Sequence, residues 1–392
     1  MYPLASSTWD KKEVEVATNL LNSGQLTLGR EVLEFEKMFA SYIGTTYAIM
    51  FNSGSSANLA MFAALKYQSS ATLRDEARVI VPAVSWSTTF YPVNQMGYVL
   101  DFVDIDSDTL NLDIAEVERQ IKPDTGAIFA VNLLGNPAEL FKLKKIADDH
   151  NLILLEDNCE SLGATLDGKR AGSFGEMSSH SFYFSHHICT MEGGMVNTNS
   201  KELMETLMSL RSHGWTRGLE DKNSVYPKSK NEWEDLFRFV LPGYNLRPTE
   251  LSAAIGKIQL SKLPAFIDER RKNGAYFKSL FDDSKSFKIQ KENGRSSWFG
   301  FSIILQGALT GKREEIINYL KIHKIETRPI VAGNFTRNPV MKHLKFEPLQ
   351  GLKNSNLVHE DGFFIGNHHY DVTENLKLIH DLLTKFEKRY SR

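Results

Sequence analysis

Short apolar segments alternate with segments of helical periodicity along residues 46–157, and this alternation constrains the fold most strongly. The apolar segments are predicted to be buried strands at residues 47–51, 77–81, 99–103, 127–131 and 152–155. Between them, helices are predicted at residues 56–65, 113–121 and 138–150. This order predicts an α/β fold with a mainly parallel sheet between helices, whose ligands bind beyond the carboxyl ends of the strands.

A smaller C-terminal α/β domain is predicted to follow. The sequence Pro248-Thr249-Glu250 is typical of a helix start, and the helical pattern continues to residue 263. A strand and two further helices are then predicted at residues 298–305, 312–322 and 371–389. We therefore expect a large domain at residues 1–247 and a small one at residues 248–392. The polar stretch at residues 216–233 is predicted to be an exposed loop.

Charge and composition exclude several classes of function. Lys and Arg number 46 and Asp and Glu number 48, so no excess of positive charge is available to attract nucleic acid or an anionic membrane. The N-terminus lacks the pattern of a signal peptide, and no apolar run reaches the roughly 18 residues of a membrane span. We expect a cytoplasmic protein that binds neither nucleic acid nor membranes.

The first predicted strand leads directly into the small, hydroxyl-rich turn Asn52-Ser53-Gly54-Ser55-Ser56-Ala57-Asn58. A turn of this kind, placed before a helix, presents backbone N–H groups that can bind phosphate. The same residue types also cap helices for stability alone, so a purely structural turn is the alternative.

A pair of carboxylates, Glu156-Asp157, ends an otherwise apolar predicted strand. A carboxylate at this position loses hydration unless it faces a cation or hydrogen-bond donors. The protonated ring nitrogen of a pyridoxal cofactor would be such a cation, and pairing with it would keep the ring an electron acceptor. An ordinary aspartate that caps a loop is the alternative.

Five motifs, in this order, resemble the DegT/StrS-type sugar-nucleotide aminotransferases, a family of fold type I pyridoxal-phosphate enzymes. They lie at residues 29–36, 52–57, 156–160, 181–194 and 243–250. The resemblance implies the fold of that family and a cofactor site assembled from residues far apart in the chain.

Residue by residue, the resemblance implies that the cofactor phosphate is held by three small residues, Gly54, Ser55 and Ser181. It also implies that Asp157 pairs with the pyridine nitrogen and that Trp86 stacks on the ring, although a core or interface role is the alternative for this tryptophan. Asn245 would reach the phosphate of the neighbouring subunit, which implies a homodimer with shared active sites.

His186 departs from the family pattern, because it stands where the aminotransferases have the lysine that binds the cofactor covalently. No lysine occurs between Lys169 and Lys201, so a shift of register cannot supply one. The cofactor would therefore be held non-covalently, and the imidazole would remain available to move protons.

The histidine resembles that of the sugar 3-dehydratases within the family. One branch of these enzymes carries a cysteine-ligated iron–sulfur cluster, for which Cys159 and Cys189 are too few. The other branch has no cluster, regenerates pyridoxamine phosphate with L-glutamate, and acts on GDP-4-keto-6-deoxy-D-mannose in colitose biosynthesis. The pair His186-His187 and Glu160, which replaces a glutamine of the aminotransferases, resemble this second branch.

The second branch implies a PLP-dependent lyase. It would remove the C3 hydroxyl of a nucleotide-linked 4-keto-6-deoxy sugar and release 2-oxoglutarate and ammonia. An aminotransferase with a free cofactor is one alternative, and a catalytically dead homologue that binds nucleotide sugar is another. The intact Asp157, Glu160 and Ser181 argue against the dead homologue.

Further polar residues are also candidates for roles near the site. His187 and His213 are expected to have structural or substrate-positioning roles. Arg217 is a candidate to bind the diphosphate of the sugar nucleotide or the carboxylate of glutamate, and a solvated loop arginine is the alternative. We predict no metal site in His186-His187-Ile188-Cys189, because adjacent residues at a strand end point to opposite sides.

Overall fold

The computed structural model describes residues 1–24, 26–68 and 73–390. Within these residues the main sheet has the strand order β1-β9-β8-β5-β4-β2-β3. Only β9 runs antiparallel to its neighbours, so the predicted, mainly parallel sheet is confirmed. The strands are β1 (Tyr47–Phe51), β2 (Arg78–Pro82), β3 (Val99–Val103), β4 (Thr125–Val131), β5 (Ile153–Asp157), β8 (Met177–Ser181) and β9 (Gly194–Thr198).

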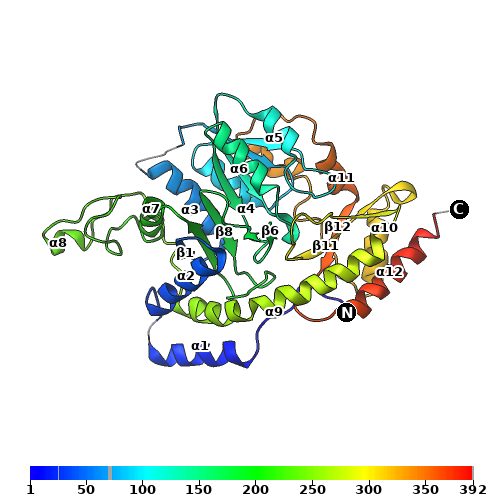
Figure 1. Cartoon of the computed structure of the whole chain (residues 1–392), viewed down its shortest axis with the longest axis horizontal. Coiled ribbons are helices and arrows are strands. Elements are labelled where there is room, and N and C mark those ends of the chain that lie inside the picture. The colour runs from blue at the N-terminus through cyan, green and yellow to red at the C-terminus, as the bar shows by residue number, and fades with distance from the viewer. Residues whose placement is uncertain (25, 69–72, 391–392) are drawn as a thin grey trace.

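Helices cover both faces of this sheet (Figure 1). Alternate residues of one strand point to opposite faces, so Phe129 of β4 belongs to a buried cluster with residues of α3, α4 and α7, whereas Ile128 belongs to one with residues of α5 and α6. The helices of this region are α1 (Lys11–Ser23), α2 (Arg30–Ile43), α3 (Gly54–Tyr67), α4 (Ser87–Gln95), α5 (Ile114–Gln120), α6 (Leu140–Asp149), α7 (Lys201–Arg211) and α8 (Glu232–Asp235). A small hairpin joins β6 (Thr165–Leu166) to β7 (Lys169–Arg170).

The long helix α9 (Glu250–Phe281) runs beneath the large sheet toward a second, smaller sheet (Figure 1). The helix continues well past residue 263, where the sequence pattern ended, and includes Pro264. The second sheet is antiparallel and has the order β10-β11-β12. Its region contains β10 (Phe287–Ile289), β11 (Gly300–Leu305), β12 (Gly362–Gly366), α10 (Arg313–Ile322), α11 (Lys353–Asp361) and α12 (Thr373–Glu387).

Core packing joins the two predicted domains at several points. Tyr2, near the N-terminus, is buried in the core of the small sheet, and Phe335 is buried in the core of the large sheet. The domain boundary at residue 247/248 stays a prediction.

Glu250 connects two of the family motifs, residues 29–36 and 243–250, which are far apart in the sequence. Its side chain is fully buried at the start of α9. The carboxylate accepts hydrogen bonds from the backbone amides of Gly29, Glu31 and Val32 at 2.8, 2.9 and 3.0 Å. These are amides of the first turn of α2, which otherwise lack partners within the helix. Glu250 thus fixes α2 to α9.

The segment that carries α8 projects away from the body of the molecule (Figure 1). Most of residues 216–233 lack regular structure and lie at the surface, and Trp233 is 80% exposed. No helix within the described residues is long and apolar enough to cross a bilayer.

Candidate active site

Asp157 lies at the carboxyl end of β5, at the edge of the sheet where the fold is expected to bind ligands. Its Oδ2 accepts hydrogen bonds from Asn58 Nδ2 at 3.0 Å and Thr89 Oγ1 at 2.8 Å. Its Oδ1 accepts one from the backbone amide of Cys159 at 3.2 Å. Three donors therefore orient the carboxylate and leave it capacity to accept a further hydrogen bond.

The preceding residue, Glu156, has a structural role. Its carboxylate accepts hydrogen bonds from the backbone amides of Gly172, Phe174 and Gly175. Burial raises the pKa of this carboxyl, although these amides oppose the shift. Because alternate strand residues face opposite ways, Glu156 fixes the loop before β8 while Asp157 faces α3 and α4.

The turn after β1 is tightly packed against β8. Ser53 caps α3 by accepting a hydrogen bond from the amide of Ser56 at 3.0 Å. A Cβ atom on Gly54 would lie 2.6 Å from Cβ of Ser181 and 3.1 Å from Sγ of Cys159. The absence of a side chain therefore lets the first turn of α3 approach the hydroxyl of Ser181.

The residues present fit pyridoxal phosphate. The amides of Gly54 and Ser55 make no hydrogen bond to any of the described residues, and they belong to the N-terminal turn of a 14-residue helix beside Ser181. Such amides suit an anionic phosphate. The hydroxyl of Ser55 contacts Thr88 Oγ1 at 3.1 Å, and Thr88 immediately precedes the Thr89 that binds Asp157. The amides that could bind the phosphate and the carboxylate of Asp157 thus belong to one connected cluster.

Glu160 lies on the loop after β5, close to this cluster. Its Oε2 accepts a hydrogen bond from the amide of Leu134 at 3.0 Å. Burial raises the pKa of Glu160 to about 7, with a smaller contribution from the negative charge of Asp157. The side chain can therefore hold or release a proton near neutral pH.

His186 lies on the loop after β8. Its ring packs against Phe299 with centroids 5.4 Å apart, and its buried Nδ1 has no hydrogen-bond partner among the described residues. Burial lowers the pKa of His186 to about 4, and the positive charge of Arg270 adds to this effect, while the backbone of Cys159 opposes it. The imidazole is therefore neutral at pH 7, with a lone pair that can accept a proton.

His187 differs from its neighbour. It is buried, and its Nε2 is 3.1 Å from the carbonyl oxygen of Ser297, to which it can donate a hydrogen bond. Burial lowers the pKa of His187 well below its usual value, and Arg270 adds to the shift. These contacts suit a residue that anchors the loop.

The side chains of the remaining predicted residues form no hydrogen bond with Asp157, Glu160 or His186 within the described residues. Trp86 is 58% exposed just before α4, so it does not belong to the core of the protomer. The amide of Asn52 donates to the carbonyl of Leu246 at 3.0 Å, which places the exposed Asn245 one residue from that contact. His213 packs on Trp215 with centroids 5.1 Å apart, and Arg217 is exposed on the projecting segment.

Four residues of the site were not found from the sequence. Asn58 and Thr89 bind Asp157, the amide of Leu134 binds Glu160, and Phe299 packs on His186. Asn58 lies within the turn motif, so its position was a signal that could have been used. The other three depend on contacts between distant segments.

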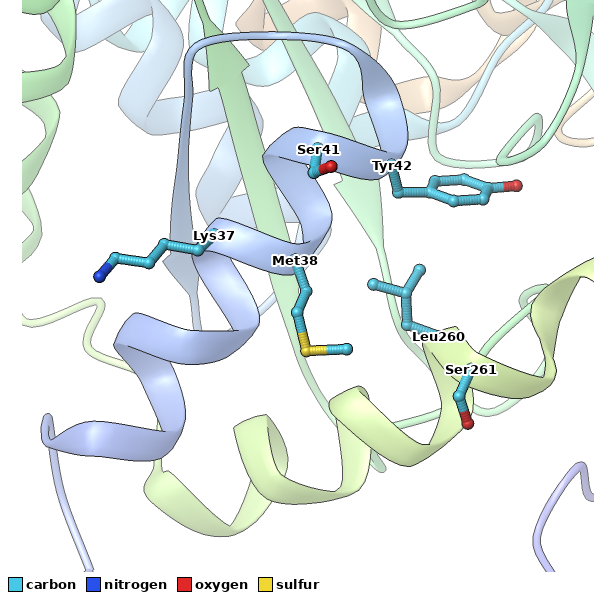
Figure 2. A pocket seen from close by; sticks show the side chains of 6 residues that line it. All are labelled: Lys37, Met38, Ser41, Tyr42, Leu260 and Ser261. Carbon is cyan, nitrogen blue, oxygen red and sulfur yellow. The ribbon is translucent and has the colours of Figure 1, made fainter.

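A hollow of about 540 Å³ between α2 and α9 is separate from these residues. Figure 2 shows its lining side chains, among which Met38 and Leu260 face the space between the helices. It contains none of the predicted site residues. Within the described chain, no group of three or more His, Cys, Asp or Glu side chains is placed to hold a metal ion.

The model of the DegT/DnrJ/EryC1/StrS aminotransferase family matches residues 7–383. The chain belongs to this family. One family member, GDP-4-keto-6-deoxy-D-mannose 3-dehydratase of Yersinia pseudotuberculosis, is 46% identical over 386 residues, which cover 98% of each chain.

Two crystal structures of GDP-4-keto-6-deoxymannose-3-dehydratase are also close to this member of the DegT/DnrJ/EryC1/StrS family. One contains a trapped PLP–glutamate geminal diamine and has a TM-score of 0.96. The other is a variant with bound GDP-perosamine and has a TM-score of 0.95. Both are 45% identical to this chain and cover 98% of it and 100% of their own chains. The family resemblance predicted from the sequence is confirmed.

Proposed function

We propose that this protein is a PLP-dependent 3-dehydratase that removes the C3 hydroxyl of GDP-4-keto-6-deoxy-D-mannose. The product is the 4-keto-3,6-dideoxy sugar nucleotide, and L-glutamate supplies the amino group, with release of 2-oxoglutarate and ammonia. The observation that carries the proposal is His186, a neutral, partly buried imidazole at the position where the aminotransferases have lysine. The 46% identical relative and the two crystal structures support the substrate, cofactor and amino donor.

The cofactor would be held without a covalent bond. Gly54, Ser55 and Ser181 would bind its phosphate, Asp157 its ring nitrogen, and Trp86 the face of its ring. When bound, it supplies a conjugated, protonated ring that accepts an electron pair. The three donors around Asp157 keep this carboxylate in place for that pairing.

His186 would act as the acid and base. The backbone of Cys159 hydrogen-bonds the ring, whereas Nδ1 has no partner among the described residues, so Nδ1 is the ring nitrogen free to accept and return a proton. The neutral ring can remove a proton at the reacting centre, and the resulting imidazolium can protonate the oxygen that leaves C3. A protonated group with a pKa of about 4 is a strong donor, which favours this second step.

Glu160 would contribute to cofactor binding in its protonated state. The amide of Leu134 occupies its Oε2, so the remaining oxygen can carry the proton toward the cofactor. Raising the pKa of this carboxyl to about 7 keeps it partly protonated at neutral pH.

We also propose a homodimer with shared active sites, in which Asn245 reaches the partner's phosphate and Arg217 and His213 bind substrate. Large exposed side chains near the site support an interface: Trp86, Tyr183, Phe184 and Met191 are 58, 49, 44 and 44% exposed. The division into domains at residues 1–247 and 248–392 and the cytoplasmic location also stay predictions.

The test is product analysis with GDP-4-keto-6-deoxy-D-mannose and L-glutamate. We expect equimolar ammonia and 3-deoxy sugar nucleotide, and 2-oxoglutarate in the same amount. A stable amino sugar without ammonia would identify an aminotransferase instead. Binding of the sugar nucleotide without any turnover, in a protein whose PLP absorbance does not respond to glutamate, would identify a dead homologue.

A further inference from the structure

Arg270 is a buried cation with no carboxylate partner among the described residues. It lies on α9 with 4% of its surface exposed, and no carboxylate within the described residues forms an ion pair with it. Burial lowers the pKa of its guanidinium to about 10. Because a buried charge is costly unless it is well bound, such an arginine requires a compensating interaction.

The compensation comes from backbone carbonyls. Nη1 of Arg270 donates to the carbonyl oxygens of Asn367 at 2.9 Å, Phe299 at 3.2 Å and Trp298 at 3.5 Å. Trp298 has a φ of +49°, a left-handed conformation that is unfavourable for a residue with a side chain. Arg270 therefore helps to hold the strained backbone of residues 297–299 (the 297–299 segment).

The 297–299 segment contacts both His186 and its neighbour His187. The ring of Phe299 packs on His186 and His187, and the carbonyl of Ser297 is the partner of His187. The amide of Phe299 donates to the carbonyl of Leu134 at 3.0 Å, and the amide of Leu134 donates to Glu160 at 3.0 Å. Continuous contacts thus lead from Arg270 to His186 on one side and to Glu160 on the other.

We propose that Arg270 is a positioning residue for the dehydration site, which fixes the 297–299 segment and, through Phe299, the places of His186 and Glu160. The inference rests on the proposed function of this site. It assigns to Arg270 no contact with substrate or cofactor.

The charge of Arg270 and its contacts have the same effect on His186, because both disfavour the protonated imidazole. The titratable groups that face the two histidines are Arg270 and Arg271 on α9 and each other, and the backbone of Cys159, after β5, hydrogen-bonds His186. Arg270 disfavours protonation of both rings, whereas Arg271 acts only on His187 and weakly. Loss of Arg270 would remove a like charge and loosen the packing on His186, and both changes favour the imidazolium.

The test compares Arg270→Met with Arg271→Met in the full-length protein. Arg271 is a matched control because it is adjacent on the helix and also binds carbonyls, those of Ser296 at 2.9 Å and Gly163 at 3.1 Å. The readout is the NMR titration of His186 with ¹³C-labelled histidine and no added PLP. The His186→Asn variant identifies the signal among the 11 histidines.

We expect the pKa of His186 to rise by about one unit in Arg270→Met, the size of effect that a nearby like charge exerts, and to stay unchanged in Arg271→Met. The midpoint of the acidic limb in the pH profile of kcat should rise by the same amount. An unchanged titration in folded Arg270→Met would overturn the proposal, as would an equal shift in both variants.

Circular dichroism reports whether Arg270→Met folds. If this variant does not fold, Arg270→Lys is used in its place to test the effect of Arg270 on His186. Lysine keeps the charge and a donor, so we expect the titration of His186 to stay as in the unaltered protein. A rise toward 6.5 in Arg270→Lys would refute the role of this charge. Because the titration needs neither cofactor nor turnover, its outcome is independent of whether the protein proves to be a dehydratase.

Discussion

Substituting Gly54 by alanine tests the proposed phosphate site by adding a single methyl group. The added Cβ would lie 2.6 Å from Cβ and 3.0 Å from Oγ of Ser181, and 3.1 Å from Sγ of Cys159. Carbon atoms in contact normally lie about 3.5–4.0 Å apart, so the methyl group would overlap Ser181 by about 1 Å. Ser181 is fixed in β8 by its pairing with Gly194 of β9, which leaves the overlap no easy relief.

The expected cost follows from this geometry. Overpacking of this kind destabilises the folded protein by about 1–3 kcal/mol, and the better helix propensity of alanine offsets at most about 1 kcal/mol of this. Displacement of the first turn of α3 from Ser181 would also move the amides of Gly54 and Ser55 away from the positions in which they can bind the phosphate. We therefore expect Gly54→Ala to bind PLP at least about tenfold more weakly, since 1.4 kcal/mol corresponds to a factor of ten.

Fluorescence titration of the apo protein with PLP measures this affinity, and urea unfolding separates it from a loss of stability. Gly218→Ala is the control, because its added Cβ would meet only Met208 Cε at 3.8 Å. PLP affinity equal to that of the unaltered protein in folded Gly54→Ala would refute the assignment of the phosphate site to this turn.

Three further predictions concern stability and pH. Glu250→Gln should lower the free energy of unfolding by about 1–3 kcal/mol in urea, because an amide cannot accept all three hydrogen bonds from α2, and Glu232→Gln on the exposed helix α8 should leave it unchanged. The turnover of the unaltered protein should stay constant from pH 6.5 down to about pH 5 on account of His186, because its base form is lost only as the pH falls through about 4; a midpoint near 6.5 would contradict this. PLP binding should weaken as the pH rises through about 7, where Glu160 ionises, and Glu160→Gln should abolish that step; a step that persists in the variant would assign it to another group.

Local sequence patterns predicted the elements of the sheet but not how they pair. Runs such as those at β1 and β3 are apolar and bounded by polar turns, so their positions were predicted correctly. The pairing of the antiparallel β9 with β1 joins segments more than 100 residues apart, which periodicity does not encode. Likewise, α9 continues through Pro264 because residues on both sides of it, including Leu263 and Ile267, are buried.

The candidate site shows the same division between local and distant information. Asp157, Glu160, Ser181 and His186 stand out in the sequence because polar side chains follow strands or interrupt a family motif. Their partners do not stand out, since Leu134 contributes only a backbone amide and Phe299 is an ordinary apolar residue. The unusual pKa values of His186 and Glu160 arise from burial, which only the folded structure reveals.

Product analysis of His186→Lys tests the central role of His186 most directly. The variant and the unaltered protein are incubated with GDP-4-keto-6-deoxy-D-mannose, PLP and L-glutamate, and ammonia, 3-deoxy sugar and amino sugar are quantified. Lysine at this position is expected to abolish dehydration and to restore some transamination, with an amino sugar as product. Unchanged release of ammonia and 3-deoxy sugar by the variant would contradict the assignment of His186 as the acid and base.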